Sequence, residues 1–204
     1  MDSPDLFAVA ANDATAGLAP KEAFPFPLFA HCRTAAILER GGWHRATAGE
    51  EDFLAAVGAF AECARFPRMG LLVQGRYGSG KTALVRALTR RTRLETVFFP
   101  LDTEYRRLNA DEYPYFVESL MKGNVVLDDL GAEVRYFERE LAAEFISRYH
   151  RLGMGRLFIT TNLDGDALLA RYTMRVASRL KDLCIPLILK GGDKRKWLVK
   201  GGAA

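Results

Sequence analysis

The 204-residue sequence lacks most features that mark a secreted or membrane-bound protein. It contains no run of about 18 apolar residues, so no transmembrane helix and no membrane partner are expected. The first residues, Met1–Asp5, are acidic and do not begin a basic segment followed by an apolar one, so no signal peptide is predicted. The only cysteines are Cys32, Cys63 and Cys184. Their odd number and wide spacing predict free thiols in a reducing cytoplasm, with neither a disulfide framework nor a metal site.

Charge of one sign is not strongly in excess either, because the formal net charge at pH 7 is +4. With 49% hydrophobic and 26% charged residues, the composition is typical of a globular protein with one well-buried α/β core and a short appendage. Basic residues gather at Arg90–Arg93, at Arg106–Arg107 and from Lys190 to Lys200. Such patches either follow a nucleic-acid backbone or form a solvated surface, and composition leaves both readings open.

Little regular structure is predicted near the N-terminus. Residues 1–27 are rich in Ala, Asp and Pro and end in Phe24–Pro27, where the prolines oppose a regular element. We predict a short, partly flexible arm over residues 1–50, with a partner-docking segment as the alternative because its phenylalanines would be costly to expose. From Glu51 to Ala64 apolar residues recur at helical spacing, and Pro67 blocks continuation of that helix.

Short apolar stretches then alternate with segments of helical periodicity. Residues 124–128 are almost continuously apolar, as expected of a parallel strand buried on both faces. This alternation predicts one five-stranded parallel sheet with helices on both faces, an α/β fold. The predicted strands are 69–74, 96–99, 124–128, 156–161 and 184–189, and the predicted helices are 81–91, 111–122, 137–152 and 164–180, the last with a break.

The segment Gly75–Thr82, Gly-Arg-Tyr-Gly-Ser-Gly-Lys-Thr, matches the P-loop (Walker A) pattern without a gap. Its glycines allow the backbone to curl so that successive N–H groups face phosphate oxygens. Lys81 would place its charge against the β- and γ-phosphates of ATP, and the Thr82 hydroxyl would ligate Mg²⁺. The following helix would present its positive end to the same phosphates. The residues expected to bind the nucleotide are Gly75, Tyr77, Gly78, Ser79, Gly80, Lys81, Thr82 and Ala83.

Two consecutive carboxylates follow the apolar strand that starts at Asn124. The carboxyl end of a parallel strand lies at the same sheet edge as the P-loop. We predict that Asp128 is the second Mg²⁺ ligand and that Asp129 orients or deprotonates the attacking water. Glu133 is the next candidate for the role of Asp129. Away from a P-loop, such a pair would often be only a capped turn.

The next predicted strand ends in Thr160-Thr161-Asn162. An amide at this edge could hydrogen-bond the γ-phosphate or the water that attacks it. The alternative is that Asn162 is an ordinary strand end that caps the helix starting near Asp164. A third polar strand end at one sheet edge favours the functional reading.

Four segments together resemble the DnaC/IstB branch of the AAA+ ATPases. They are Leu127–Glu133, Ile159–Leu163, Arg175–Leu180, which is similar to the box VII segment of that branch, and Gly191–Arg195, which resembles the ending of its last strand. The resemblance covers about residues 50–197, and the motifs follow the family's order and spacing.

The resemblance implies that Asp128 is the Walker B residue, that Asn162 is the sensor-1 residue, and that Arg179 is an arginine finger acting on the ATP of a neighbouring subunit. Arg175 is the alternative finger. It further implies strand order 5-1-4-3-2, an ATPase domain over residues 51–197 followed by a tail at 198–204, and ATP-dependent self-association on DNA.

Three departures from the family pattern affect what can be carried over. Asp129 stands where many AAA+ proteins have Glu, so we expect hydrolysis to be slow or to depend on assembly or DNA. The sequence ends soon after its last predicted strand, so no C-terminal lid domain is expected. The region before Glu51 is short, so the helicase-docking domain of larger loaders is expected to be reduced or replaced.

The leading functional hypothesis is a DnaC-like replicative helicase loader. An IstB-like transposition helper, which recruits a transposase, is the alternative in the same class. A small-molecule P-loop kinase and a nucleotide-dependent adaptor that hydrolyses slowly are two further alternatives. Both leading hypotheses require binding of DNA, with single strands preferred. The candidate DNA contacts are Arg106, Arg107, Lys194, Arg195 and Lys196.

Overall fold

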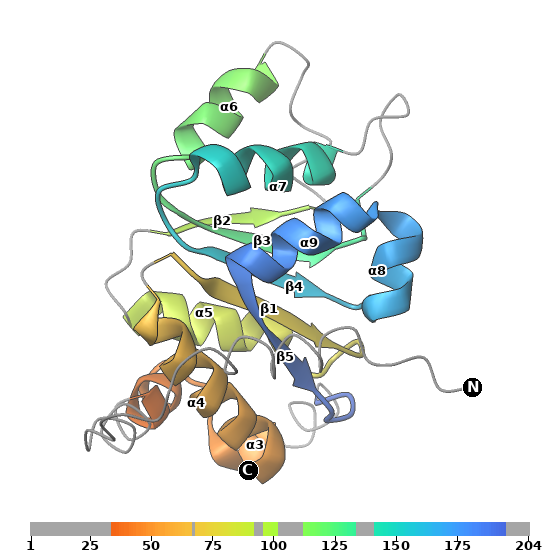
Figure 1. The fold of residues 1–204 in the computed structure, drawn as a ribbon. Coiled ribbons are helices and arrows are strands. Elements are labelled where there is room, and N and C mark those ends of the chain that lie inside the picture. The colour runs from red at the N-terminus through yellow and green to blue at the C-terminus, as the bar shows by residue number, and fades with distance from the viewer. Residues whose placement is uncertain (1–33, 67, 92–95, 102–111, 134–140, 195–204) are drawn as a thin grey trace, which may run out of the picture.

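The computed structural model describes residues 34–66, 68–91, 96–101, 112–133 and 141–194 (Figure 1). The strands are β1 (Gly70–Gly75), β2 (Thr96–Pro100), β3 (Asn124–Leu130), β4 (Leu157–Thr161) and β5 (Cys184–Leu189). The helices are α3 (Arg45–Ala48), α4 (Glu50–Arg65), α5 (Lys81–Arg91), α6 (Glu112–Leu120), α7 (Leu141–Leu152), α8 (Gly165–Arg171) and α9 (Met174–Leu183). None of these described helices has the length and apolar character needed to cross a membrane.

All five strands belong to one parallel sheet in the order β2-β3-β4-β1-β5. This is the predicted order 5-1-4-3-2 read from the other edge. The three inner strands β3, β4 and β1 are mostly buried, and every residue of the central strand β4 is buried, whereas the edge strands β2 and β5 are partly exposed. Because parallel strands end at one edge, the sheet brings the ends of β1, β3 and β4 together at the site described below.

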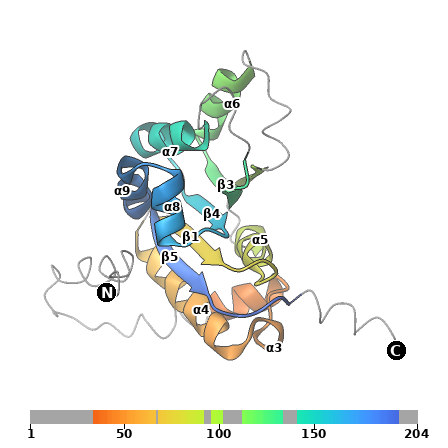
Figure 2. The same ribbon diagram turned by 90° about the vertical axis from the view of Figure 1, so that its right-hand side faces the viewer.

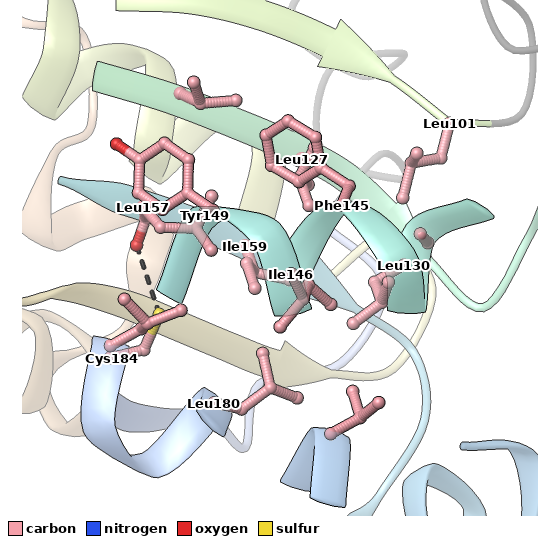
Figure 3. Packing of buried hydrophobic residues seen from close by; sticks show 14 of the residues in the cluster. Leu101, Leu127, Leu130, Phe145, Ile146, Tyr149, Leu157, Ile159, Leu180 and Cys184 are labelled. Carbon is pink, nitrogen blue, oxygen red and sulfur yellow. Dashed lines mark hydrogen bonds between the residues drawn. The ribbon is translucent and has the colours of Figure 1, made fainter. Parts of the chain in front are cut away.

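Helices cover both faces of the sheet (Figure 2). On one face, α7, α8 and α9 pack around a cluster that includes Ile146, Tyr149 and Leu180, seen from close by in Figure 3. On the other face, α4 and α5 bury a second cluster that includes Phe53 and Leu84. This two-sided burial gives the central strands their continuous apolar character.

The element boundaries that the structure describes lie within three residues of their predicted positions. The predicted break in helix 164–180 is confirmed, because α8 ends at Arg171 and α9 begins at Met174. The Asp164 carboxylate accepts a 2.8 Å hydrogen bond from the N–H of Ala167 and so caps α8. Strand β3 continues two residues beyond the predicted end, to Leu130. The start of predicted helix 137–152 lies outside the described residues, which resume at 141.

Part of the predicted N-terminal arm is described, and it packs against α4. Leu38 is fully buried, and Trp43 and Ala48 are almost so. The Trp43 indole stacks on Phe53 of α4 with ring centroids 5.9 Å apart. Residues 1–33 of the arm and the predicted tail 198–204 lie outside the described residues.

Candidate nucleotide-binding site

The P-loop curls between the end of β1 and the start of α5, as its glycines predict. Gly78 and Gly80 have φ angles of 76° and 94°, a region that side chains other than glycine rarely adopt. A Cβ at Gly78 would also overlap the Asp193 side chain. Glycine is therefore required here both by the backbone and by the segment packed outside the loop.

Lys81 is the first residue of α5, directly after the loop, and is 5% exposed. Its ammonium donates hydrogen bonds to the carbonyls of Gly75 (2.9 Å) and Arg76 (3.0 Å). It also donates to Oδ1 of Asn162 at 2.6 Å. The positive charge of Lys81 is thus held against the loop, beside the N-terminus of α5. The lysine charge and the helix N-terminus both favour binding of a phosphate group.

Thr82 and Asp128 form the candidate Mg²⁺ site. The Thr82 hydroxyl donates to Oδ1 of Asp128 at 2.9 Å, and the buried Thr160 hydroxyl donates to the same oxygen at 2.6 Å. One hydroxyl and one carboxylate suit Mg²⁺, which is typically bound by one or two carboxylates with phosphate and water oxygens completing its shell. Among the described residues, no group of three or more His, Cys, Asp or Glu side chains could hold a metal ion without such outside ligands.

A β-bulge allows two consecutive aspartates to face the same site. Leu127 pairs with Ile159 and Leu130 with Thr161, so β3 has one residue more than β4 in this interval. Within it, Asp129 has φ 59° and is the only described non-glycine residue with positive φ. Aspartate tolerates this conformation better than most residues, and such strain clusters at functional sites.

Asn162 joins the P-loop to Asp129. Its Nδ2 donates to Oδ1 of Asp129 at 3.2 Å, while its Oδ1 accepts from Lys81. The Asp129 N–H in turn donates to the Thr160 hydroxyl at 2.9 Å. The predicted site residues at the start of α5, near the end of β3 and just after β4 therefore meet in one hydrogen-bonded network. The sequence reasoning did not assign a role to Thr160, although its place in a polar strand end was a signal.

Glu133, the predicted substitute for Asp129, makes hydrogen bonds and an ion pair outside this network. It is 6% exposed, and its Oε2 accepts from the N–H of Gly131 at 2.7 Å. The Tyr172 hydroxyl donates to its Oε1, and Arg171 lies 3.6 Å from the same oxygen. Burial and the Glu133 charge raise the pKa of Tyr172, so its hydroxyl stays a donor. Glu133 thus ties the turn after β3 to α8, and the expectation that it could activate water is not supported.

The two candidate finger residues lie on a different surface. Arg175 and Arg179 of α9 line a groove of about 480 Å³ together with Arg148 and Arg151 of α7. The Arg179 guanidinium donates to the hydroxyl of Ser147. Partial burial, and then the charges of Arg175 and Arg151, lower the pKa of Arg179. The sequence reasoning missed the two α7 arginines, because only the packing of α7 on α9 brings them to this groove.

One of the five predicted DNA contacts, Lys194, takes part in an ion pair, and the other four are not described. The Lys194 ammonium lies 3.1 Å from a carboxylate oxygen of Asp52, and only 18% of the Lys194 side chain is exposed. A cation held by a buried carboxylate is less available to a DNA backbone, so the DNA contact of Lys194 stays a prediction that this ion pair disfavours. Arg106, Arg107, Arg195 and Lys196 lie outside the described residues.

Comparison with known proteins rests on structure alone. No protein-family model matches the chain, and no curated protein matches it in sequence. Among solved structures, the DnaC helicase loader is 24% identical, with a TM-score of 0.57 over 70% of this chain and 90% of that one. DnaI is 23% identical, with a TM-score of 0.52 over 65% of this chain and 78% of that one. The chain therefore has the P-loop AAA+ fold that its motifs indicate, similar to the folds of DnaC and DnaI.

Proposed function

We propose that the chain binds ATP with Mg²⁺ at Gly75–Thr82, hydrolyses it, and acts on DNA as a helicase loader of the DnaC type. The observation that carries the ATPase proposal is the network at the carboxyl edge of the sheet. Within this network Lys81 donates directly to Asn162, and Asn162 donates to Asp129. The Asp129 N–H donates to Thr160, whose hydroxyl donates to Asp128. Thr82 donates to the same oxygen of Asp128. A glycine-rich turn with a purely structural role would not require these charged and polar side chains around it.

Each residue of the network has a distinct task in this proposal. The P-loop N–H groups and Lys81 bind the phosphates, and Thr82 and Asp128 hold the metal. Bound Mg²⁺ would supply positive charge that stabilises the transferred phosphoryl group. Asp129 accepts a proton from the attacking water or orients it, and Asn162 fixes the direction of the Asp129 carboxylate through its amide.

Completion of the site by a second copy is the next part of the proposal. Arg179 contacts Ser147 of α7, in a groove between α7 and α9, whereas Lys81 belongs to α5 on the opposite face of the sheet. This position favours contact of Arg179 with ATP bound to a neighbouring subunit over contact with ATP bound at the chain's own P-loop. Arg175, on the same groove, remains the alternative. ATP-dependent self-association follows, with hydrolysis depending on assembly.

The partner in DNA metabolism is proposed from likeness of fold. Similarity to the DnaC helicase loader and to DnaI favours a replicative helicase as partner and single-stranded DNA as ligand. A transposase, as partner of an IstB-like helper, is the second candidate, since the ATPase motifs are shared by both types. A pull-down from the host with the tagged chain, probed for the replicative helicase and for any transposase encoded nearby, distinguishes them.

The ATP site is tested by Lys81→Ala. Its ammonium donates to the Gly75 and Arg76 carbonyls and to Asn162, which all belong to the site, so the fold should survive while binding of a fluorescent ATP analogue is lost. Arg65→Ala is the matched control, because Arg65 lies away from the P-loop and forms an exposed ion pair with Glu62. Equal affinity in wild type and Lys81→Ala would contradict the assignment of the site.

A further inference from the structure

The segment Lys190–Lys194, which follows β5, lies against the outer side of the P-loop. The Lys194 N–H donates to the Gly78 carbonyl at 2.9 Å, and the Asp193 side chain fills the space beside Gly78. The stem of Lys194 reaches the other end of the loop, where a Cβ at Gly80 would lie 3.7 Å from its Cδ. The segment thus contacts the P-loop at two points.

Asp52 of α4 holds this segment in place. Its Oδ1 accepts from the N–H of Lys190 at 2.8 Å, and its Oδ2 accepts from the N–H of Gly191 at 3.0 Å. The Lys194 ammonium donates to the same Oδ2 at 3.1 Å. The Asp52 side chain is 4% exposed, so its charge has little access to water and depends on these three donors.

The contact with Gly78 fixes the orientation of one peptide plane in the phosphate-binding loop. In a trans peptide the C=O and N–H point in opposite directions. Holding the Gly78 carbonyl outward therefore directs the Ser79 N–H into the loop, where it donates to the Arg76 carbonyl at 3.2 Å. This hydrogen bond helps to keep the loop curled, and the curled backbone is what directs the other N–H groups of a P-loop at phosphate.

We propose that Asp52 is a positioning residue for nucleotide binding, which acts by clamping Lys190–Lys194 against the P-loop. The proposal rests on the ATP site proposed above, and it adds a function for two parts of the chain that the P-loop pattern does not include. Lys194 is the second member of this clamp, since both its backbone and its ammonium take part.

The test compares Asp52→Asn with Glu51→Gln. The Glu51 carboxylate, next in the same helix, pairs with the Lys190 ammonium at 2.7 Å, but both side chains are exposed, so its loss should matter little. Asp52→Asn should weaken binding of a fluorescent ATP analogue by about tenfold, the equivalent of about 1.4 kcal/mol, and Glu51→Gln by less than about twofold. Lys194→Met keeps the stem, should shift the affinity in the same direction, and carries the test if Asp52→Asn fails to fold.

Hydrogen exchange in the nucleotide-free protein separates this proposal from the ATP proposal. Asp52→Asn should speed exchange of the amides in a peptide covering 76–82, and Glu51→Gln should not. Tyr149→Phe, which loses a 2.7 Å hydrogen bond to the Gly123 carbonyl, is a control for stability loss at a distance from the loop. If Asp52→Asn only lowers the melting temperature, as Tyr149→Phe should, with P-loop exchange and affinity unchanged, the positioning role is refuted. If Asp52→Asn speeds exchange in the P-loop but the wild-type protein binds no ATP, the ATP site is refuted, and only the structural contact between Lys190–Lys194 and the loop is supported.

Discussion

Replacing Asp129 with asparagine tests whether this carboxylate drives hydrolysis. The substitution removes the charge but suits the backbone, because Asn, like Asp, tolerates the left-handed region in which Asp129 lies at φ 59°. The amide oxygen of the new side chain can still accept from Nδ2 of Asn162, which lies 3.2 Å from Oδ1 of Asp129 in the wild type. Nucleotide affinity should therefore stay within about twofold of wild type, because binding relies on the P-loop rather than on this carboxylate.

The expected loss in turnover is large. A positioned general base typically contributes about 10²–10⁴-fold, so phosphate release at saturating ATP should fall by about that factor in Asp129→Asn. The assay must be run at high protein concentration with single-stranded DNA, since the site is proposed to need a neighbouring subunit. A mutant that hydrolyses ATP at the wild-type rate would refute the role of Asp129 as a base.

A companion variant separates chemistry from backbone strain. Alanine in the left-handed region costs about 1–2 kcal/mol more than in its ordinary conformations. For a domain of this size each kcal/mol lowers the melting temperature by about 2–4 °C. Asp129→Ala should therefore melt several degrees below Asp129→Asn, while both lose turnover. Equal melting temperatures would show that the bulge in β3 relaxes around Asp129.

Three further predictions follow from the same geometry. Mixing inactive Arg179→Ala with inactive Lys81→Ala should restore some ATPase activity if an intact P-loop meets a neighbour's intact finger, and co-assembled mixtures that stay inactive at every ratio would argue against a shared site. Tyr172→Phe should lower the free energy of unfolding by about 1.5–3 kcal/mol in urea titrations, because it removes a hydrogen bond to the buried charge of Glu133. Affinity for single-stranded DNA should fall with salt by about 0.7 in log–log slope per phosphate contact, and Lys194→Met should leave that slope unchanged because Asp52 already holds its ammonium; a shallower slope would return Lys194 to the DNA surface.

Local patterns in the sequence were sufficient to predict the P-loop and the type of each element around it. Gly75–Thr82 is contiguous, and each strand or helix carries its own periodicity, so neither depends on distant contacts. The parallel sheet followed from the alternation of these elements. The strand order followed from the resemblance to AAA+ proteins, since alternation alone does not fix which strands are neighbours.

The meeting of Lys81, Asp128 and Asn162 was also predictable, because the carboxyl ends of parallel strands share an edge. The exact geometry of the site could not be predicted from the sequence. The bulge that turns both Asp128 and Asp129 into the site arises from a mismatch between β3 and β4. A register shift depends on both strands at once and leaves no mark in either sequence alone.

Contacts between residues remote in the chain were decided by tertiary structure alone. Asp52 and Lys194 are 142 positions apart, and no periodicity or motif relates them. The sequence therefore suggested a basic DNA-binding surface for Lys194, since charge was the only property visible there. Packing of α4 beside β5 brought a buried carboxylate to that lysine. A cation near a buried anion forms an ion pair instead of remaining at the surface, because the anion cannot stay unpaired away from water.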